Sequence, residues 1–167
     1  MKYIIFILLL STYSWANSIE FLTGGITYHL FNDPSVSQNY VTKLSGDGAL
    51  IYNPLYGIRY TVDDKMFYNS YSFFGGENSI GQNMGGGLYS FGVLDSNVQL
   101  GFALGAYLQN GELFNQQVDT FTNGNIIPLY GFEFNYKVDL GNKCFIKLNN
   151  LLTPLLYNAT IGIGQEF

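Results

Sequence analysis

Apolar and polar residues alternate one by one along most of this sequence. In the clearest stretch, residues 98–108, the even-numbered positions are all apolar, whereas the odd-numbered ones are glycine, alanine, glutamine and tyrosine. Successive side chains of a β-strand point to opposite faces, so this alternation predicts strands. It recurs eight times, and we expect strands at residues 18–30, 49–62, 65–74, 86–94, 98–108, 126–138, 143–152 and 157–167.

The polar face of these expected strands is small and carries few charges. A soluble β-sandwich would expose many lysines and glutamates on that face, whereas here glycines dominate and charges of both signs are sparse: Arg59, Glu133, Lys137, Lys147 and Glu166. Sparse opposite charges suit the interior of a narrow barrel, where they can pair, while the apolar face meets lipid. The sequence therefore predicts an all-β fold, an eight-stranded antiparallel transmembrane β-barrel of the bacterial outer membrane.

The expected connections alternate between long and tight. The long ones are residues 31–48, 75–85 and 109–125, and the tight ones are residues 63–64, 95–97 and 141–142. With the N-terminus in the periplasm, the tight turns fall on the periplasmic side and the long loops outside, as is the rule in outer-membrane barrels. The last strand ends on Phe167, which resembles an outer-membrane assembly signal, so we expect the barrel-assembly machinery as a partner.

Composition agrees with this fold class. Only 11% of the residues are charged, against roughly 25% in soluble domains. Residues 1–16 have a positive start, an apolar run and small residues before Ala16, which is the layout of a secretory signal peptide. We expect a signal peptide at 1–16, with an uncleaved anchor as the alternative, and one barrel domain at 17–167.

The same composition argues against several classes of function. The net charge is −5, and no basic stripe favours nucleic acid. Cys144 is the single cysteine and His29 the single histidine, so we expect no intramolecular disulfide, no metal site and no cofactor.

His29 is the first candidate for chemistry, because it lies at the outer end of the first expected strand. By alternation it belongs to an inward-facing set with Phe21, Thr23, Gly25 and Thr27, whereas Leu22, Ile26, Tyr28 and Leu30 face outward. Ser70 and Ser72 face inward on the third expected strand, near the same rim. A histidine and a serine that converge there would be base and nucleophile for acyl transfer. A structural histidine, and serines that fill a tapering interior, are the alternatives.

Two short motifs resemble a known family. Residues 24–29, Gly-Gly-Ile-Thr-Tyr-His, and residues 67–70, Phe-Tyr-Asn-Ser, look like those of the lipid A palmitoyltransferase (PagP) family of outer-membrane enzymes. The resemblance implies acyl transfer from a phospholipid to lipid A, with these membrane lipids as partners. It makes His29 the catalytic histidine and Ser70 the serine, and it places Asn69 where the family has an acid. His29, Asn69 and Ser70 are thus the candidate catalytic residues.

Prolines extend the resemblance. In that family, prolines interrupt strand pairing near the rim and let a lipid tail enter the barrel sideways, which is physically reasonable because proline cannot donate to the ladder. Here Pro54, Pro128 and Pro154 fall within or beside expected strands.

Two functions stay open at this point. The first is the acyltransferase, with His29 as general base and the barrel interior as the ruler of acyl length. The second is a non-enzymatic surface barrel, used for adhesion, surface masking or membrane reinforcement. It would act through the polar and acidic outer loops, which contain Asp33, Asp47, Glu77, Glu112 and Asp119. In either case we expect a monomer.

Overall fold

The computed structural model describes residues 17–30, 41–42, 50–64, 66–78, 83–109, 126–154 and 156–167. The expected signal peptide, residues 1–16, lies outside the described residues. Among those described, no helix has the length and apolar character needed to cross a membrane. The strands are β1 (Ser18–His29), β2 (Val41–Thr42), β3 (Leu50–Tyr52), β4 (Leu55–Asp64), β5 (Phe67–Glu77), β6 (Asn83–Asp95), β7 (Val98–Gln109), β8 (Ile126–Gly141), β9 (Cys144–Leu152) and β10 (Leu156–Glu166).

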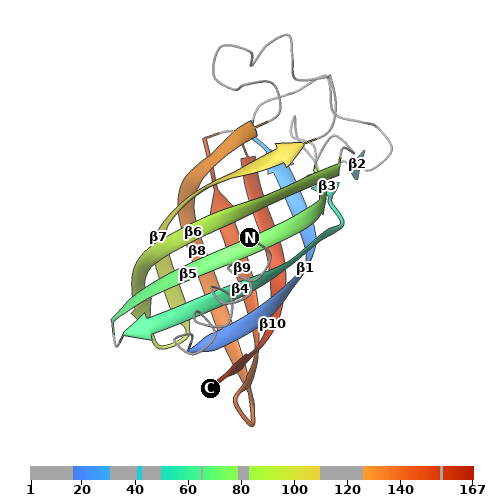
Figure 1. Ribbon diagram of the computed structural model, residues 1–167. Coiled ribbons are helices and arrows are strands. Elements are labelled where there is room, and N and C mark those ends of the chain that lie inside the picture. Colours follow the sequence, from blue (N-terminus) through green and yellow to red (C-terminus); the bar gives the residue numbers. More distant parts are fainter. Residues whose placement is uncertain are drawn as a thin grey trace, which may run out of the picture.

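Eight of these strands close into an antiparallel barrel (Figure 1). The strands β4 to β10 follow β1 in chain order, and β10 pairs back with β1 along its length, from Ser18↔Glu166 to His29↔Leu156. The short β3 continues β4 across Asn53–Pro54 and pairs with β1, and β2 pairs with β3. The predicted eight-stranded antiparallel barrel is confirmed.

The strands are strongly inclined to the barrel axis. Starting at Leu22, the paired residues lead through β4, β5, β6 and β7 to Ile127 of β8. In the other direction they lead through β10 and β9 to Lys137 of the same strand. The two directions around the barrel thus reach β8 at residues 127 and 137, which are ten residues apart. Such a stagger requires tilted strands.

The two ends of the barrel differ. One end, called the turn end below, has the tight connections after Asp64, Asp95 and Gly141. Both ends of the barrel domain meet there, because the Phe167 amide donates to the Asn17 carbonyl at 3.0 Å. At the other end, called the loop end, the strands lead into residues 31–49, 79–82 and 110–125. The predicted placing of the tight connections at one end and the longer ones at the other is confirmed. The expected long connection 75–85 is wrong, because β5 runs to Glu77 and β6 begins at Asn83, which leaves only residues 78–82 between them.

The distribution of apolar and polar side chains is the reverse of that in a soluble protein. The large side chains on the outer wall are apolar and exposed, among them Phe21, Tyr56, Phe73, Phe102, Leu104, Phe132 and Ile163. The buried interior is rich in polar and charged side chains, among them Glu20, Arg59, Ser70, Glu133, Asn135 and Lys147. A soluble protein buries apolar groups instead, so this is the arrangement of a transmembrane barrel whose outer wall faces lipid.

A β-bulge in β1 corrects part of the predicted facing. The pairing of β1 with β10 shifts register between Thr23 and Ile26, and Gly24 has a φ of 67° there, a value that glycine adopts at little cost. Because of the extra residue, the side chains that precede the bulge in β1 face the opposite way from the prediction. Phe21 and Thr23, predicted inside, are therefore exposed outside, and Leu22, predicted outside, is buried inside. Beyond the bulge, the outward facing of Ile26 is confirmed.

Candidate functional site

Towards the turn end, the interior is filled by a cluster of paired charges around Arg59. The two terminal nitrogens of Arg59 donate to the two oxygens of Glu133, at 2.5 and 2.8 Å. The Oε1 atom of Glu20 lies 2.9 Å from Lys147 Nζ and 3.4 Å from Arg59 Nε. Tyr68 also donates its hydroxyl to Glu133, at 3.0 Å. These residues, the charge cluster, hold two cations and two anions, so their burial is electrically balanced.

The sequence predicted only part of this cluster. The inward positions of Arg59, Glu133 and Lys147 are confirmed. Glu20 was missed because simple alternation placed it outside, and the bulge at Gly24 turns it inward. Nearer the turn end, the predicted inward residues Lys137 and Glu166 pair with each other, with Nζ and Oε1 2.5 Å apart.

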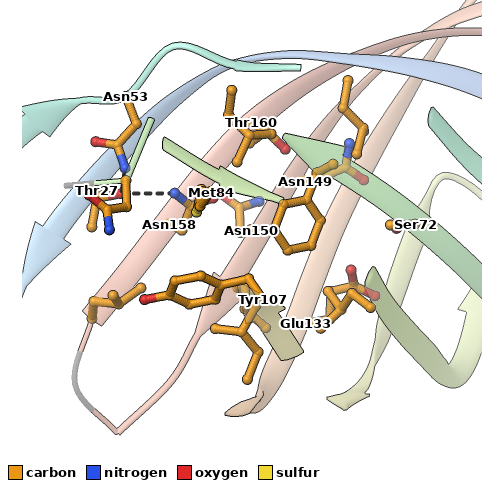
Figure 2. Close-up of a pocket in the computed structure, with 18 of the residues that line it drawn as sticks. Thr27, Asn53, Ser72, Met84, Tyr107, Glu133, Asn149, Asn150, Asn158 and Thr160 are labelled. Atoms are coloured by element: carbon orange, nitrogen blue, oxygen red, sulfur yellow. Dashed lines mark hydrogen bonds between the residues drawn. The ribbon is translucent and has the colours of Figure 1, made fainter. Parts of the chain in front are cut away.

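On the loop-end side of the charge cluster, the interior holds a cavity of about 110 Å³ (Figure 2). Its floor is formed by Arg59 and Glu133 with Ser72 and Asn149. From Arg59 the lining runs along β4 and past its first residue to Asn53, a distance of about 20 Å for extended backbone. Its walls are largely apolar, with Asn150 and Thr160 as polar members; the apolar ones are Leu22, Leu55, Phe74, Met84, Leu88, Tyr107, Leu129, Leu151 and Leu156. This half of the interior thus combines a charged floor with apolar walls.

Uncharged amides and a hydroxyl surround the loop-end opening of this cavity. Thr27 Oγ1 accepts hydrogen bonds from Asn53 Nδ2 at 3.0 Å and from Asn158 Nδ2 at 2.9 Å, the latter drawn in Figure 2. On another part of the rim, Asn78 Nδ2 donates to Gln109 Oε1 at 2.8 Å. We call these five residues the amide collar. They hold polar groups at the opening without any formal charge.

The structure does not bring His29 and Ser70 together. His29 is the last residue of β1 and pairs with Leu156 of the cavity wall. Ser70 pairs with Thr61, which pairs with Ser18, the first residue of β1. Ser70 is therefore aligned with the first residue of β1, whereas His29 is the last residue of that 12-residue strand. The predicted convergence of His29 and Ser70 at one rim is wrong.

The reason is the position of Ser70 along β5. That strand extends to Glu77, so Ser70 lies in its turn-end part and accepts a hydrogen bond from Arg59 Nη2 at 2.6 Å. The predicted inward facing of Ser70 and Ser72 is confirmed. Asn69 faces outward, where its Oδ1 accepts a hydrogen bond from the Tyr89 hydroxyl at 2.7 Å. None of the three candidates is among the residues that line the cavity. His29 is nearest its loop-end opening, through its pairing with Leu156 of the wall.

Prolines mark two interruptions of the barrel wall at the loop end. Pro54 separates β3 from β4, so the predicted strand 49–62 is split. Pro154 follows the end of β9, whose pairing with β8 begins only at Phe132↔Leu152. Residues 126–131 of β8, with Pro128 among them, thus pair with β7 but have no described strand partner on the other side.

A groove of about 390 Å³ on the outer wall adjoins the second interruption. Tyr130 and Leu152 line this groove, while their chain neighbours Leu129 and Leu151 line the cavity inside. A single layer of strand therefore separates the groove from the cavity, at the place where the strand pairing stops.

The described residues contain no group of three or more histidine, cysteine or acidic residues placed to hold a metal ion. Cys144 lies exposed at the turn end, away from the cavity.

Comparison with known proteins gives a structural likeness but no match to a family model. No protein-family model matches the sequence, and no curated protein matches it. Among solved structures, the chain is similar to Ail, the attachment invasion locus protein of Yersinia pestis, crystallised with the heparin analogue sucrose octasulfate. The match has a TM-score of 0.38 and 14% identity, and it covers 90% of this chain and 98% of Ail. It carries no argument about function.

Proposed function

We propose that the protein resides in the bacterial outer membrane and takes the acyl chain of a membrane lipid into the loop-end half of its barrel. The observation that carries this proposal is the cavity, because its leucine-rich walls lie inside a barrel whose interior is otherwise polar. Water and charges fill the interior of most such barrels. An apolar space closed at one end by paired charges favours a hydrocarbon chain instead.

The interrupted wall supports access for that chain from the membrane. The outer groove beside Pro154 faces lipid, and the cavity lies directly behind it. A chain that passes between β8 and β9 would not have to break a continuous ladder of backbone hydrogen bonds there, because residues 126–131 have no partner from β9. A lipid tail would thus enter sideways, which agrees with the family resemblance of the sequence.

The chemistry we propose is transfer of this chain to lipid A, with His29 as general base. His29 would take the proton of a lipid A hydroxyl while the hydroxyl oxygen attacks the ester carbonyl of the phospholipid. The new ester bond forms as the old one breaks, and the proton passes to the departing lysophospholipid. The position of His29 at the cavity opening supports this role, and Ser70 has no part in it.

Mass spectrometry of lipid A tests the reaction. The protein is expressed in a host that lacks its own lipid A acyltransferase, and we expect one added acyl chain. His29→Ala should abolish the addition, whereas Ser70→Ala should retain it in the fraction that folds. Unchanged lipid A from a folded wild-type protein in the outer membrane would contradict the proposal.

A non-enzymatic surface barrel is the second candidate function. The observation that favours it is the separation of His29 from Ser70, because these two predicted catalytic residues cannot act on each other across that distance. The outer loops, rich in acidic residues, would then carry the function. Unchanged lipid A together with an occupied cavity would support a lipid-binding but non-catalytic version of this candidate.

A further inference from the structure

The amide collar lies where the head group of a bound amphiphile would sit. A chain that fills the cavity with its end on the Arg59–Glu133 floor has its polar end at the opposite opening. Thr27, Asn53, Asn78 and Asn158 line the cavity in that region. Their chemistry therefore bears on which lipid the proposed chain-binding site accepts.

The collar offers both donors and acceptors. Asn53 and Gln109 are 4% and 2% exposed. The Oδ1 atom of Asn53 and the Nε2 group of Gln109 have no hydrogen-bond partner among the described residues. Buried polar groups are normally satisfied, so one acceptor and one donor remain to be matched. A hydroxyl group both donates and accepts, and it can match either of them.

The surrounding charges disfavour an anionic head group. The charged residues that line the cavity, Arg59 and Glu133, are at its floor and bind each other. The described residues at the opening, the amide collar, carry no charge that could pair with an anion. Burial of an anion without a partner is costly.

We infer that the opening selects an amphiphile whose head group has hydrogen-bonding groups but no net charge, as in a polyol or a zwitterionic phospholipid, over an anionic one with the same chain. This inference rests on the proposed acyl-chain site. It adds a second requirement to that site: the walls select the chain, and the collar selects the head group.

Two detergents with the same chain test the inference. The full barrel is placed in a lipid nanodisc and titrated with decyl maltoside or decyl sulfate below their micelle concentrations. Side-chain amide signals in ¹⁵N NMR spectra report on the collar. We expect saturable shifts for Asn53 and Asn158, with at least about tenfold tighter binding of the maltoside.

The outcomes separate the two proposals. Equal affinities, or tighter binding of the sulfate, overturn the head-group selection but leave the chain site standing. If neither detergent shifts these signals, both the selection and the chain site fail.

A pair of variants ties the preference to the collar. Asn158→Leu keeps the side-chain size but removes the amide, so the maltoside should lose about tenfold in affinity while the sulfate is unaffected. Asn69→Leu makes the same change on the outer wall and should alter neither. Asn53→Leu gives a second test if Asn158→Leu does not fold. A preference that persists in both collar variants would contradict the inference.

Discussion

The two halves of the barrel interior accommodate their buried polar side chains differently. Both halves lie inside a wall that faces lipid, and both contain buried polar side chains. In the turn-end half, Arg59, Glu133, Glu20 and Lys147 satisfy one another directly and fill the space. In the loop-end half, uncharged amides and leucines leave a cavity. The comparison teaches that paired charges fill the turn-end half, whereas the loop-end half leaves the space in which we propose that a ligand binds.

Removing Arg59, the central cation of the charge cluster, should have the largest effect on the difference between the two halves. Arg59→Met leaves Glu20 and Glu133 with fewer partners in a buried site, and breaking a buried pair typically costs about 3–5 kcal/mol. We expect a loss of that size in the free energy of unfolding, measured by urea titration of the barrel in bilayers. Adding Glu133→Gln should recover much of it. A loss below about 1 kcal/mol would mean that the cluster is not structural.

Adding a methyl group to the interior and to the outer wall gives the second test. At Gly101, in the interior, a Cβ atom would lie 2.6 Å from the Tyr68 hydroxyl and would meet the Phe91 carbonyl, so Gly101→Ala should cost about 1–3 kcal/mol through overpacking. Gly85 pairs with the exposed Leu108 on the outer wall, and the nearest atom to its Cβ position is 3.8 Å away. Gly85→Ala should therefore be nearly neutral in the same unfolding titration. Equal costs would show that the interior beside the charge cluster is not tightly packed.

A larger side chain in the cavity tests whether this space binds the ligand, with only a small expected effect on stability. Leu88→Phe places extra carbon atoms into empty space, so we expect a change within about 1 kcal/mol. Binding of decyl maltoside should nevertheless weaken at least about tenfold. Unaltered binding in this variant would place the ligand elsewhere.

Strand alternation predicted the architecture because only every second residue meets lipid. In β7 no irregularity interrupts the pattern, and the predicted strand 98–108 differs from the observed one by a single residue at one end. In β1 the bulge between Thr23 and Ile26 adds one residue. A pattern of period two does not reveal such an insertion, so the facing of Phe21 and Leu22 was wrong and Glu20 was missed.

The candidate site depended on information that alternation does not contain. The facing of Ser70 follows from the pattern, but its level along the barrel follows from register and tilt, which place it beside Arg59 instead of His29. The cavity arises from the sizes of side chains contributed by every one of the eight barrel strands. The three prolines and His29 were the sequence signals that pointed to this end, and two of the prolines do mark interruptions of the wall.

The central claim is that an acyl chain lies inside the loop-end half, and a nuclear Overhauser measurement tests it most directly. The barrel, with protonated leucine methyl groups, is placed in a deuterated lipid nanodisc with one equivalent of protonated decyl maltoside. The account predicts contacts from the decyl chain to the methyl groups of Leu88 and Leu151, which line the cavity. Contacts only to Leu100 and Leu104, which lie exposed on the outer wall, would contradict it.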